Sequence, residues 1–313
     1  MNHDTAPQVG IDVSKGELVV SVEGFRPFHK PNTPGGVEEL IERLPVSAIV
    51  HMESSGGYER LARRMLESAG FEVRVHNPHR SLRLAQAKSI KAKTDPIDAA
   101  HLAENGRLLP VRKLKSTERE ALTDLSRAID RLKRDIGQYK KMCNAPELDE
   151  DARLTFEQAI EALGSVLKQA KATFEKRLGQ SSFAGERRLA MTVPGIGPET
   201  ARICICELPE DFRERASTQI ASYAGLAPMD CSSGRFIGQK RLRKGNSRLK
   251  AAFYMAAMTA IFHFDWARRL YRGLRQKGKV HQAAIAAVMR RLLVRVLSVL
   301  RSGKPWEERP LHA

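Results

Sequence analysis

The sequence has few cysteines and few aromatic residues, and it has no long uninterrupted apolar run. The four cysteines, Cys143, Cys204, Cys206 and Cys231, show neither the spacing of a zinc site nor that of a disulfide framework. The most apolar stretch, residues 285–300, is interrupted by three arginines, which argues against a membrane span. The N-terminus lacks a basic and then apolar signal segment. These absences exclude a disulfide-rich secreted protein and favour a cytoplasmic protein without a membrane partner.

Acidic residues become scarce towards the C-terminus. Residues 1–110 contain 14 Lys and Arg against 14 Asp and Glu, and residues 111–185 contain 15 against 12. Residues 186–313 contain 24 against 10, so that they hold 14 of the 17 excess positive charges. A surface that only needs to be soluble interleaves the two signs. The imbalance therefore favours a polyanion as the partner of the C-terminal region.

The first third of the sequence alternates strand and helix patterns. Residues 8–24 are typical of two strands joined by a turn at residues 14–16, and further strand patterns lie near Phe28 and at residues 46–53 and 71–76. Helix patterns cover residues 34–44 and 58–69. A hairpin followed by alternating helices and strands predicts a mixed α/β sheet with helices on its faces.

Residues 92–103 place two carboxylates at the start of a helix. Asp95 before Pro96 is typical of an N-cap followed by the first helical residue, which puts Asp98 at the third helical position. Residues three apart share a helix face, so both carboxylates point to one spot. There they either hold a divalent cation or satisfy the free N–H groups of the first turn.

Two further acids lie in or at the end of the predicted strands. Asp12 stands among apolar strand residues, and Glu53 ends the strand of residues 46–53. An aspartate in such a strand must be paired or bind a metal to offset its desolvation, although Asp12 could cap a turn and Glu53 could be an ordinary strand-end residue. Taken together with Asp95 and Asp98, they favour a site for two divalent ions, which can activate a nucleophile and hold the leaving oxygen of a phosphodiester.

Two heptad patterns follow the acids. Their apolar positions are Leu122, Leu125, Ile129, Leu132, Ile136, Tyr139 and Cys143 in the first, and Phe156, Ile160, Leu163, Leu167, Ala170 and Phe174 in the second. Residues 144–146, which include a proline, separate them. The pattern predicts two helices, arranged as an antiparallel hairpin, as an arm that also pairs with another protomer, or as part of a compact bundle.

The C-terminal region combines a glycine turn with a basic segment. Residues 192–201, TVPGIGPETA, fit a helix-hairpin-helix unit that offers N–H groups to a phosphate, or an ordinary turn between helices. Helix patterns cover residues 249–263, 265–275 and 281–301. Residues 235–250 contain seven basic residues and no acid. The expected phosphate contacts, each with solvated surface charge as the alternative, are Arg235, Lys240, Arg241, Arg243, Lys244 and Arg248.

The order of these motifs resembles the insertion-sequence 110 family of transposases over nearly the whole chain. GIDVSK around Asp12, the strand-end Glu53 and KTDPIDA around Asp95 and Asp98 resemble that family's RuvC-like DEDD domain. VPGIGPETA, YAGLAP, SSG and KGNSRL, all within residues 193–249, resemble its C-terminal transposase domain.

The resemblance implies a metal site, a nucleophile and nucleic-acid partners. Two Mg²⁺ ions would be held by Asp12, Glu53, Asp95 and Asp98. Ser233, the serine before the glycine, would attack DNA and hold it covalently, with Ser232 as the alternative. Because the acids and the serine fall in different predicted domains, a composite site formed in a dimer or tetramer is implied. So are double-stranded DNA as substrate, a structured noncoding bridge RNA as guide, and the nucleoid as location.

The sequence thus predicts an RNase H/RuvC-like α/β domain over residues 1–110, a helical coiled-coil arm over 111–185 and a mostly helical, basic transposase domain over 186–313. Three alternatives stay open. A metal-dependent nuclease without the serine step shares the acids. An actin-like ATP-dependent kinase also opens with a Gly-Ile-Asp strand, but it needs further glycine-rich loops that are not found here. A non-catalytic nucleic-acid-binding protein would leave Asp12 and the Asp95/Asp98 pair unexplained.

Overall fold

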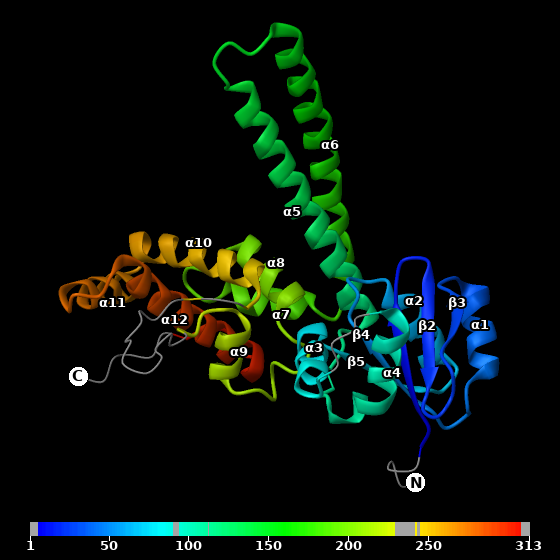
Figure 1. Ribbon diagram of the computed structural model, residues 1–313. Helices are drawn as coiled ribbons and strands as arrows, with labels where there is room; N and C mark the ends of the chain where they lie inside the picture. Colours follow the sequence, from blue (N-terminus) through cyan, green and yellow to red (C-terminus); the bar gives the residue numbers. More distant parts are fainter. Residues whose placement is uncertain (1–5, 90–93, 112, 229–241, 243–244, 308–313) are drawn as a thin grey trace. The chain divides into compact units, whose positions relative to one another are not determined.

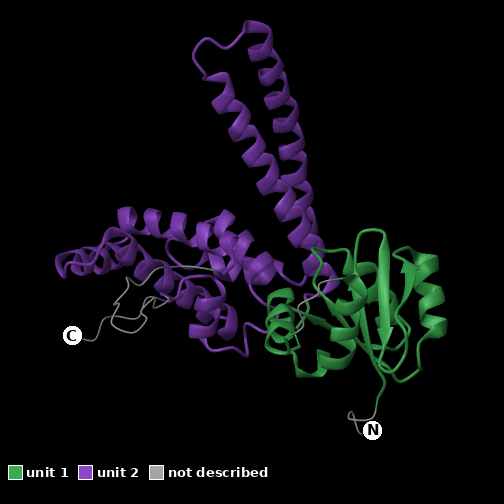
Figure 2. Cartoon of the chain, viewed as in Figure 1, with its two compact units in different colours: residues 1–114 green, residues 115–313 purple. Residues whose placement is uncertain are grey.

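The computed structural model describes residues 6–89, 94–111, 113–228, 242 and 245–307. This part of the chain belongs to two compact units, residues 1–114 and residues 115–313 (Figures 1 and 2). Each unit has hydrophobic core clusters of its own. Among the helices described, none combines the length and the apolarity that crossing a membrane requires.

The first unit is built on a five-stranded mixed sheet, as the strand patterns predicted. Its strands are β1 (Gln8–Val13), β2 (Glu17–Val22), β3 (Phe28–Pro31), β4 (Ile49–Glu53) and β5 (Glu72–His76), in the order β3-β2-β1-β4-β5. The strand β2 pairs antiparallel with both β1 and β3, whereas β4 pairs parallel with both β1 and β5. The strand β1 therefore lies at the centre of the sheet.

Helices α1 (Pro34–Arg43) and α2 (Glu59–Ser68) supply the apolar side chains that cover one face of the sheet. Successive side chains of a strand point to opposite faces, and the odd positions of β1, Val9, Ile11 and Val13, join Val37 of α1 and Leu66 of α2 in one core. Thr33 caps α1 by accepting a hydrogen bond from the N–H of Gly36.

The even positions of β1 are Gln8, Gly10 and Asp12, and this face is covered by α4 (Asp95–Asn105). The helix contacts β1, β2 and β4 and continues into the short 3₁₀ helix η1 (Gly106–Leu108). Helix α3 (Pro78–Ala87) precedes it and is capped by the side chain of Asn77. The sheet is thus apolar towards α1 and α2 and carries polar residues towards α4.

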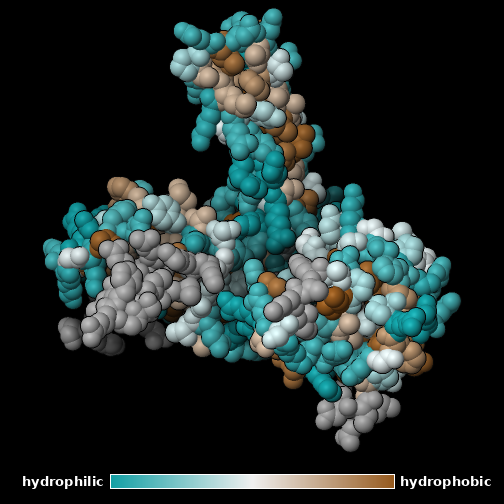
Figure 3. All heavy atoms as spheres, viewed as in Figure 1, coloured by the Kyte–Doolittle hydropathy of each residue, from teal (hydrophilic) through white to brown (hydrophobic). Residues whose placement is uncertain are grey.

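The second unit begins with a long helical hairpin. Helices α5 (Thr117–Cys143) and α6 (Glu150–Gln180) pack side by side along their length (Figure 1). Near one end, Leu122 and Phe174 are buried together with Ile205, and further along the rings of Tyr139 and Phe156 stack with centroids 5.7 Å apart. On the side of this hairpin that Figure 3 shows, hydrophobic residues lie among hydrophilic ones. Of the arrangements that the sequence left open, the two helices form the hairpin; its coiled-coil packing and its pairing with another protomer stay predictions.

The remaining helices of the second unit enclose its largest core. They are α7 (Ala184–Met191), α8 (Pro198–Glu207), α9 (Ser217–Tyr223), α10 (Ser247–His263), α11 (Asp265–Gln276) and α12 (His281–Ser302). The turn between α7 and α8 contains Gly195 at a φ of 97°, a conformation that favours glycine. Helices α8, α10 and α12 bury apolar side chains against one another. The helices predicted over residues 249–263, 265–275 and 281–301 are confirmed within two residues at each end.

Candidate active site

Asp12 and Glu53 lie at the carboxyl ends of two neighbouring parallel strands. Ile11 of β1 pairs with Met52 of β4 in the sheet register, so Asp12 and Glu53 follow at the next position. Because side chains alternate along each strand, these two acids share the face that carries Gly10. That is the face on which α4 packs.

The first turn of α4 brings Asp95 and Asp98 to this face. The carbonyl of Thr94 accepts the first hydrogen bond of the helix from the N–H of Asp98, at 2.9 Å. Thr94 has an extended backbone and is the N-cap, so Asp95 is the first helical residue and Asp98 the fourth. The predicted N-cap at Asp95 is therefore wrong by one residue. The two acids nevertheless stay three residues apart within one turn.

Asp12 lies close enough to the three other acids for their charges to raise its pKa. The pKa of Asp12 is raised from its usual 3.8 to about 6, first by burial and then by the negative charges of Asp95, Asp98 and Glu53, in that order. A hydrogen bond to the backbone of Val13 opposes the rise. Like charges that stand close together in a partly dehydrated site disfavour ionisation, and a cation placed among them would remove the penalty.

The donor chemistry of these residues fits a divalent cation. Carboxylate oxygens are the ligands that Mg²⁺ prefers, and Asp12 with its three acidic neighbours supplies several of them on one face of the sheet. Within the described ranges, however, no group of three or more His, Cys, Asp and Glu side chains stands in an arrangement that could hold a metal ion. Asp12 thus has three acids near it, without the arrangement of a formed metal site.

The loop after Glu53 is held by Glu59, a residue that the sequence analysis did not single out. The Glu59 carboxylate accepts hydrogen bonds from the N–H and hydroxyl of Ser55, at 3.1 and 3.0 Å, and from the N–H of Gly57 at 2.8 Å. Burial alone would raise the pKa of Glu59, but these hydrogen bonds outweigh it and lower the pKa. The Gly56-Gly57 pair shortly before the start of α2 was the available signal.

A row of buried polar side chains continues the α4 face of the sheet. The ring of His51 contacts His76 (Nδ1 to Nε2, 2.9 Å) and Gln8 (Nε2 to Oε1, 2.7 Å). His51 is fully buried, and burial, followed by the charges of His76 and Arg74, lowers its pKa to about 3. The backbone of Gly106 lies against this ring, because a Cβ there would stand 2.3 Å from the His51 Cγ. This row is neutral and supports α4.

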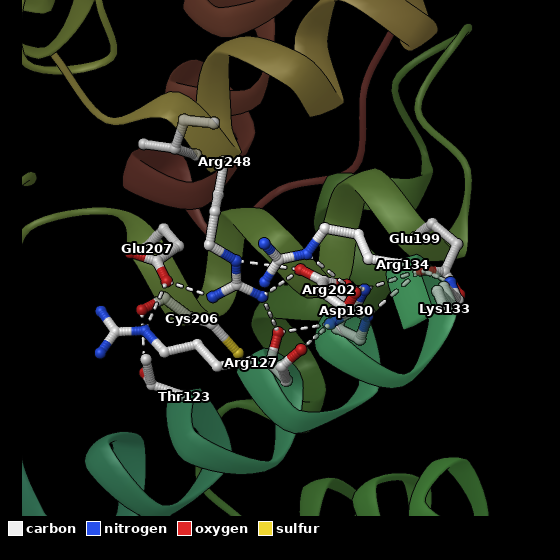
Figure 4. Close-up of polar contacts among 12 residues, drawn as sticks. Thr123, Arg127, Asp130, Lys133, Arg134, Glu199, Arg202, Cys206, Glu207 and Arg248 are labelled. Carbon is white, nitrogen blue, oxygen red and sulfur yellow. Dashed lines mark hydrogen bonds and ion pairs between the residues drawn. The ribbon is translucent and has the colours of Figure 1, made fainter. Parts of the chain in front are cut away.

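The C-terminal candidates divide into residues outside and inside the described ranges. Those outside are Ser232, Ser233, Arg235, Lys240, Arg241, Arg243 and Lys244. Arg248, in the first turn of α10, is described and is surrounded by acceptors (Figure 4). Its guanidinium donates to Asp130 from Nε and Nη2, at 2.9 and 2.6 Å, to Ser126 at 2.7 Å and to Glu207. These partners come from α5 and α8, so Arg248 joins three helices; its role as a phosphate contact stays a prediction.

Comparison with known proteins gives related matches to both halves of the chain. A family described as "Transposase IS116/IS110/IS902 family" matches residues 187–272, and a DEDD transposase family of IS110 elements matches residues 9–145. The pilin gene-inverting protein of Moraxella lacunata is 27% identical over 270 residues, which are 82% of this chain and 81% of the relative.

Proteins of insertion elements give shorter matches. The IS110 43.6 kDa protein of Streptomyces coelicolor is 32% identical over 119 residues, 38% of this chain and 29% of the relative. The IS900 42 kDa protein of Mycobacterium paratuberculosis is 32% identical over 152 residues, 48% of this chain and 37% of the relative. The first family match contains Ser233 and the second contains all four acids. The chain belongs to the IS110 family of transposases.

Proposed function

We propose that this transposase cuts and rejoins DNA at the ends of an insertion element, with Asp12, Glu53, Asp95 and Asp98 as the ligands of Mg²⁺. The observation that carries the proposal is the pKa of Asp12, which burial and the three other acids raise to about 6. Holding four acids close together in a partly buried site costs free energy that a bound cation would offset, and such a cost is typical of a functional site. The sheet order, with an antiparallel hairpin beside parallel strands, supports a RuvC-like first unit.

In this proposal, the four acids bind the metal, and the secondary structure around them holds them in position. Bound Mg²⁺ would polarise the phosphate and favour the ionised form of an attacking hydroxyl. Asp12 and Glu53 hold their place because they extend two paired strands, and Asp95 and Asp98 because α4 packs on β1. Glu59 keeps the loop after Glu53 in one conformation. The acids are thus fixed by backbone elements and not by flexible loops.

The proposed nucleophile is Ser233, which belongs to the second unit in sequence. Its hydroxyl would attack a DNA phosphorus and form a phosphoserine linkage while a deoxyribose oxygen leaves, and a later attack by a DNA hydroxyl would release the serine. The family match over residues 187–272 supports this assignment. A nuclease that uses the same acids without the serine would form no such linkage.

The proposed guide is a structured noncoding RNA. The excess of 14 positive charges in residues 186–313 supports binding of a polyanion backbone, while base pairing would select the DNA sequence. Purification of the protein from its host and sequencing of the bound RNA tests this part. Recovery of a transcript from the element itself is expected, and recovery of ribosomal fragments alone would contradict it.

Cleavage of a supercoiled plasmid that carries the element ends tests the metal site. With Mg²⁺ and copurified RNA, Asp12→Asn and Glu53→Gln should lower the cleavage rate by at least about a hundredfold. Glu42→Gln is the matched control, because Glu42 is exposed on α1, which covers the opposite face of the sheet. Equal cleavage by the Asp12 variant and the control would remove the basis of the proposal.

A covalent protein-DNA adduct that survives denaturation by SDS tests the serine. Ser233→Ala should abolish the adduct and leave plasmid binding unchanged, whereas Ser232→Ala should retain the adduct. Loss in the Ser232 variant alone would move the nucleophile by one residue. Mg²⁺-dependent cleavage without any adduct in the wild-type protein would favour the nuclease without a serine step.

A further inference from the structure

A pocket of about 440 Å³ opens between the three C-terminal helices of the second unit. Helices α10 and α11 each contribute three residues at spacings of three and four, the spacing at which side chains share a helix face. They are Met258, Ile261 and Phe262 from α10 and Arg268, Tyr271 and Arg272 from α11. His281, at the start of α12, closes one side. The volume falls within the range of roughly 300–1,000 Å³ that small-molecule sites occupy.

The pocket lies where the chain turns from α10 into α11. Phe264 has an extended backbone and is both the C-cap of α10 and the N-cap of α11. Ala267 and Ala260 are buried on the core side of the bend. The residues on the other side line the pocket, and Phe262 remains 68% exposed. An aromatic side chain this exposed is available for contact with a ligand.

Tyr271 is held in a fixed orientation at the wall of the pocket. Its hydroxyl and the Nδ1 of His281 form a hydrogen bond of 2.6 Å. The two rings meet edge to face, with centroids 5.8 Å apart and an angle of 83° between their planes. A second aromatic surface therefore stands beside Phe262 with little freedom left to lose when a ligand binds.

The charges around the pocket are positive. Arg268 is oriented by Asp265, at 2.8 Å, and by the carbonyl of Phe262, at 2.6 Å. Arg272 is exposed and has no hydrogen-bond or ion-pair partner within the described part of the chain. An arginine that is left without an acid, next to two aromatic rings, suits an anion that carries a flat ring system.

We propose that this pocket binds one unstacked nucleotide of a single-stranded nucleic acid, with its base against Phe262 and Tyr271 and its phosphate on Arg272. A base has a flat face for stacking, and the phosphate attached to its sugar supplies the negatively charged partner that Arg272 lacks. Double-stranded DNA keeps its bases stacked inside the duplex and cannot enter. The proposal rests on the proposed function only in taking nucleic acid as the partner, and it assigns a site apart from the four acids.

Binding of a fluorescein-labelled oligonucleotide of about 12 nucleotides to the full chain in EDTA tests the pocket, because no cleavage occurs there. Oligouridylate and oligothymidylate distinguish RNA from DNA as the source of the nucleotide. Phe262→Ala and Arg272→Ala should each weaken binding of at least one of them by about tenfold. Only Arg272→Ala should also lower the slope of log affinity against log salt, by about 0.7. Binding of a duplex of equal length should be unchanged by Phe262→Ala.

The matched control is Arg269→Ala, which removes the same charge from the neighbouring exposed position of α11, outside the pocket. Phe262→Ala removes no core side chain, so its melting temperature should equal that of the wild type. A photocrosslink from 4-thiouridine or 4-thiothymidine should map to the peptide that contains Phe262 or Tyr271. Equal binding by the Phe262 variant and the Arg269 control would overturn the proposal.

Two other outcomes have separate meanings. A wild-type protein that binds no oligonucleotide and no duplex would contradict the proposed function and the pocket together. The wild type could also bind oligonucleotide and duplex while Phe262→Ala loses only self-association, as measured by sedimentation. That result would show that the pocket binds a second copy of this chain, and it would overturn the nucleotide proposal. Asp12→Asn should bind the oligonucleotides as the wild type does, since the acids are not part of the pocket.

Discussion

Gly10 of β1 and Ala99 of α4 lie so close together that a Cβ on Gly10 would stand 2.0 Å from the carbonyl oxygen of Ala99. The same Cβ would lie 2.4 Å from the backbone nitrogen of Ala103. Only glycine permits this approach of a helix to a central strand. Gly10 stands two residues before Asp12 on the same face, and Ala99 follows Asp98. The close contact therefore sets the distance between the acid of the strand and the acids of the helix.

Replacing Gly10 by alanine should damage both stability and the metal site. The obstructing atoms belong to the backbone of α4, so the helix must move away from the sheet, at a cost of roughly 3 kcal/mol or more in the free energy of unfolding. Urea denaturation measures this cost. Cleavage of the plasmid should fall in parallel, because Asp95 and Asp98 move with α4.

Gly16→Ala provides the control for that experiment. Gly16 lies in the turn between β1 and β2, and nothing stands within 4 Å of a Cβ added to it. This variant should match the wild type in stability and cleavage. A Gly10 variant that folds with the stability of the Gly16 variant would show that α4 does not depend on the contact.

Asp12 should make the protein less stable as the pH rises. Its pKa is about 6 in the folded chain and 3.8 when unperturbed. Between these values the folded state holds more protons than the unfolded state, so the free energy of unfolding decreases as the pH increases through this interval. Asp12→Asn removes this dependence. Its stability relative to the wild type should be greater at pH 7.5 than at pH 4.5, as measured by urea denaturation without Mg²⁺.

At neutral pH, Mg²⁺ should make the wild type more stable than the Asp12→Asn variant. Binding to the native site stabilises the wild type by mass action, and the melting temperature should rise with the Mg²⁺ concentration. The Asp12 variant should show a much smaller rise. An equal response of both proteins to Mg²⁺ at pH 7.5 would contradict a role of Asp12 as a ligand.

The sequence was sufficient to predict the parts of the site that depend on local pattern. Asp12 could be placed inside a strand and Glu53 at the end of one, because a charged residue interrupts or closes an apolar run. The pair Asp95/Asp98 could be placed because a proline marks a helix start. The heptad spacing predicted the two helices α5 and α6, with the hairpin as one of their possible arrangements. Each of these signals lies within a few residues of the position it describes.

The parts that depend on distant partners could not be predicted. Arg248 belongs to a basic run, which suggested a phosphate contact, yet its partner Asp130 is 118 residues away in the sequence. The row of Gln8, His51 and His76 becomes visible only when three strands are paired. No local pattern distinguishes an exposed arginine or histidine from one that a later helix covers.

The buried histidines should make the protein sensitive to acid. Burial lowers the pKa of His51 to about 3, and burial also lowers the pKa of His76 and His101. Below the unperturbed histidine pKa of 6.5, the unfolded state binds protons that the folded state does not bind. For His51 alone, the free energy of unfolding should decrease by up to about 1.4 kcal/mol for each pH unit below that value.

NMR of the histidine ring protons measures the relevant pKa directly. The His51 signal should not titrate between pH 7 and pH 5 while the protein remains folded. Urea denaturation of the Asp12→Asn variant, which lacks the opposing contribution of Asp12, should show the lower stability at pH 5. A His51 ring that titrates near pH 6.5 in the folded protein would contradict its buried and neutral state.

Glu207 should be essential for the stability of the second unit. Its side chain is 3% exposed, forms an ion pair with Arg248, and accepts a hydrogen bond from Asn246 at 2.8 Å. Burial alone would raise its pKa, but the charges of Lys115, Arg248 and Arg127 and the Asn246 hydrogen bond lower it. Glu207→Gln leaves these cations without their shared acid, and it should cost about 3–5 kcal/mol in the free energy of unfolding. Asp135→Asn, which breaks an exposed pair with Arg131, should cost about 0.5 kcal/mol or less.

Arg248→Lys distinguishes a structural role of this residue from contact with a phosphate. A lysine keeps the charge but cannot donate to Asp130, Ser126 and Glu207 at once, because it lacks the planar fork of the guanidinium. If Arg248 joins the helices, Arg248→Lys should be less stable than the wild type. At temperatures at which the variant is folded, its affinity for DNA should depend on salt as that of the wild type does. Arg248→Ala would then also keep that slope, whereas loss of a phosphate contact would lower it by about 0.9. Because three acceptors already surround the guanidinium, a phosphate could reach it only by displacing Asp130 or Glu207, so an unchanged slope is expected.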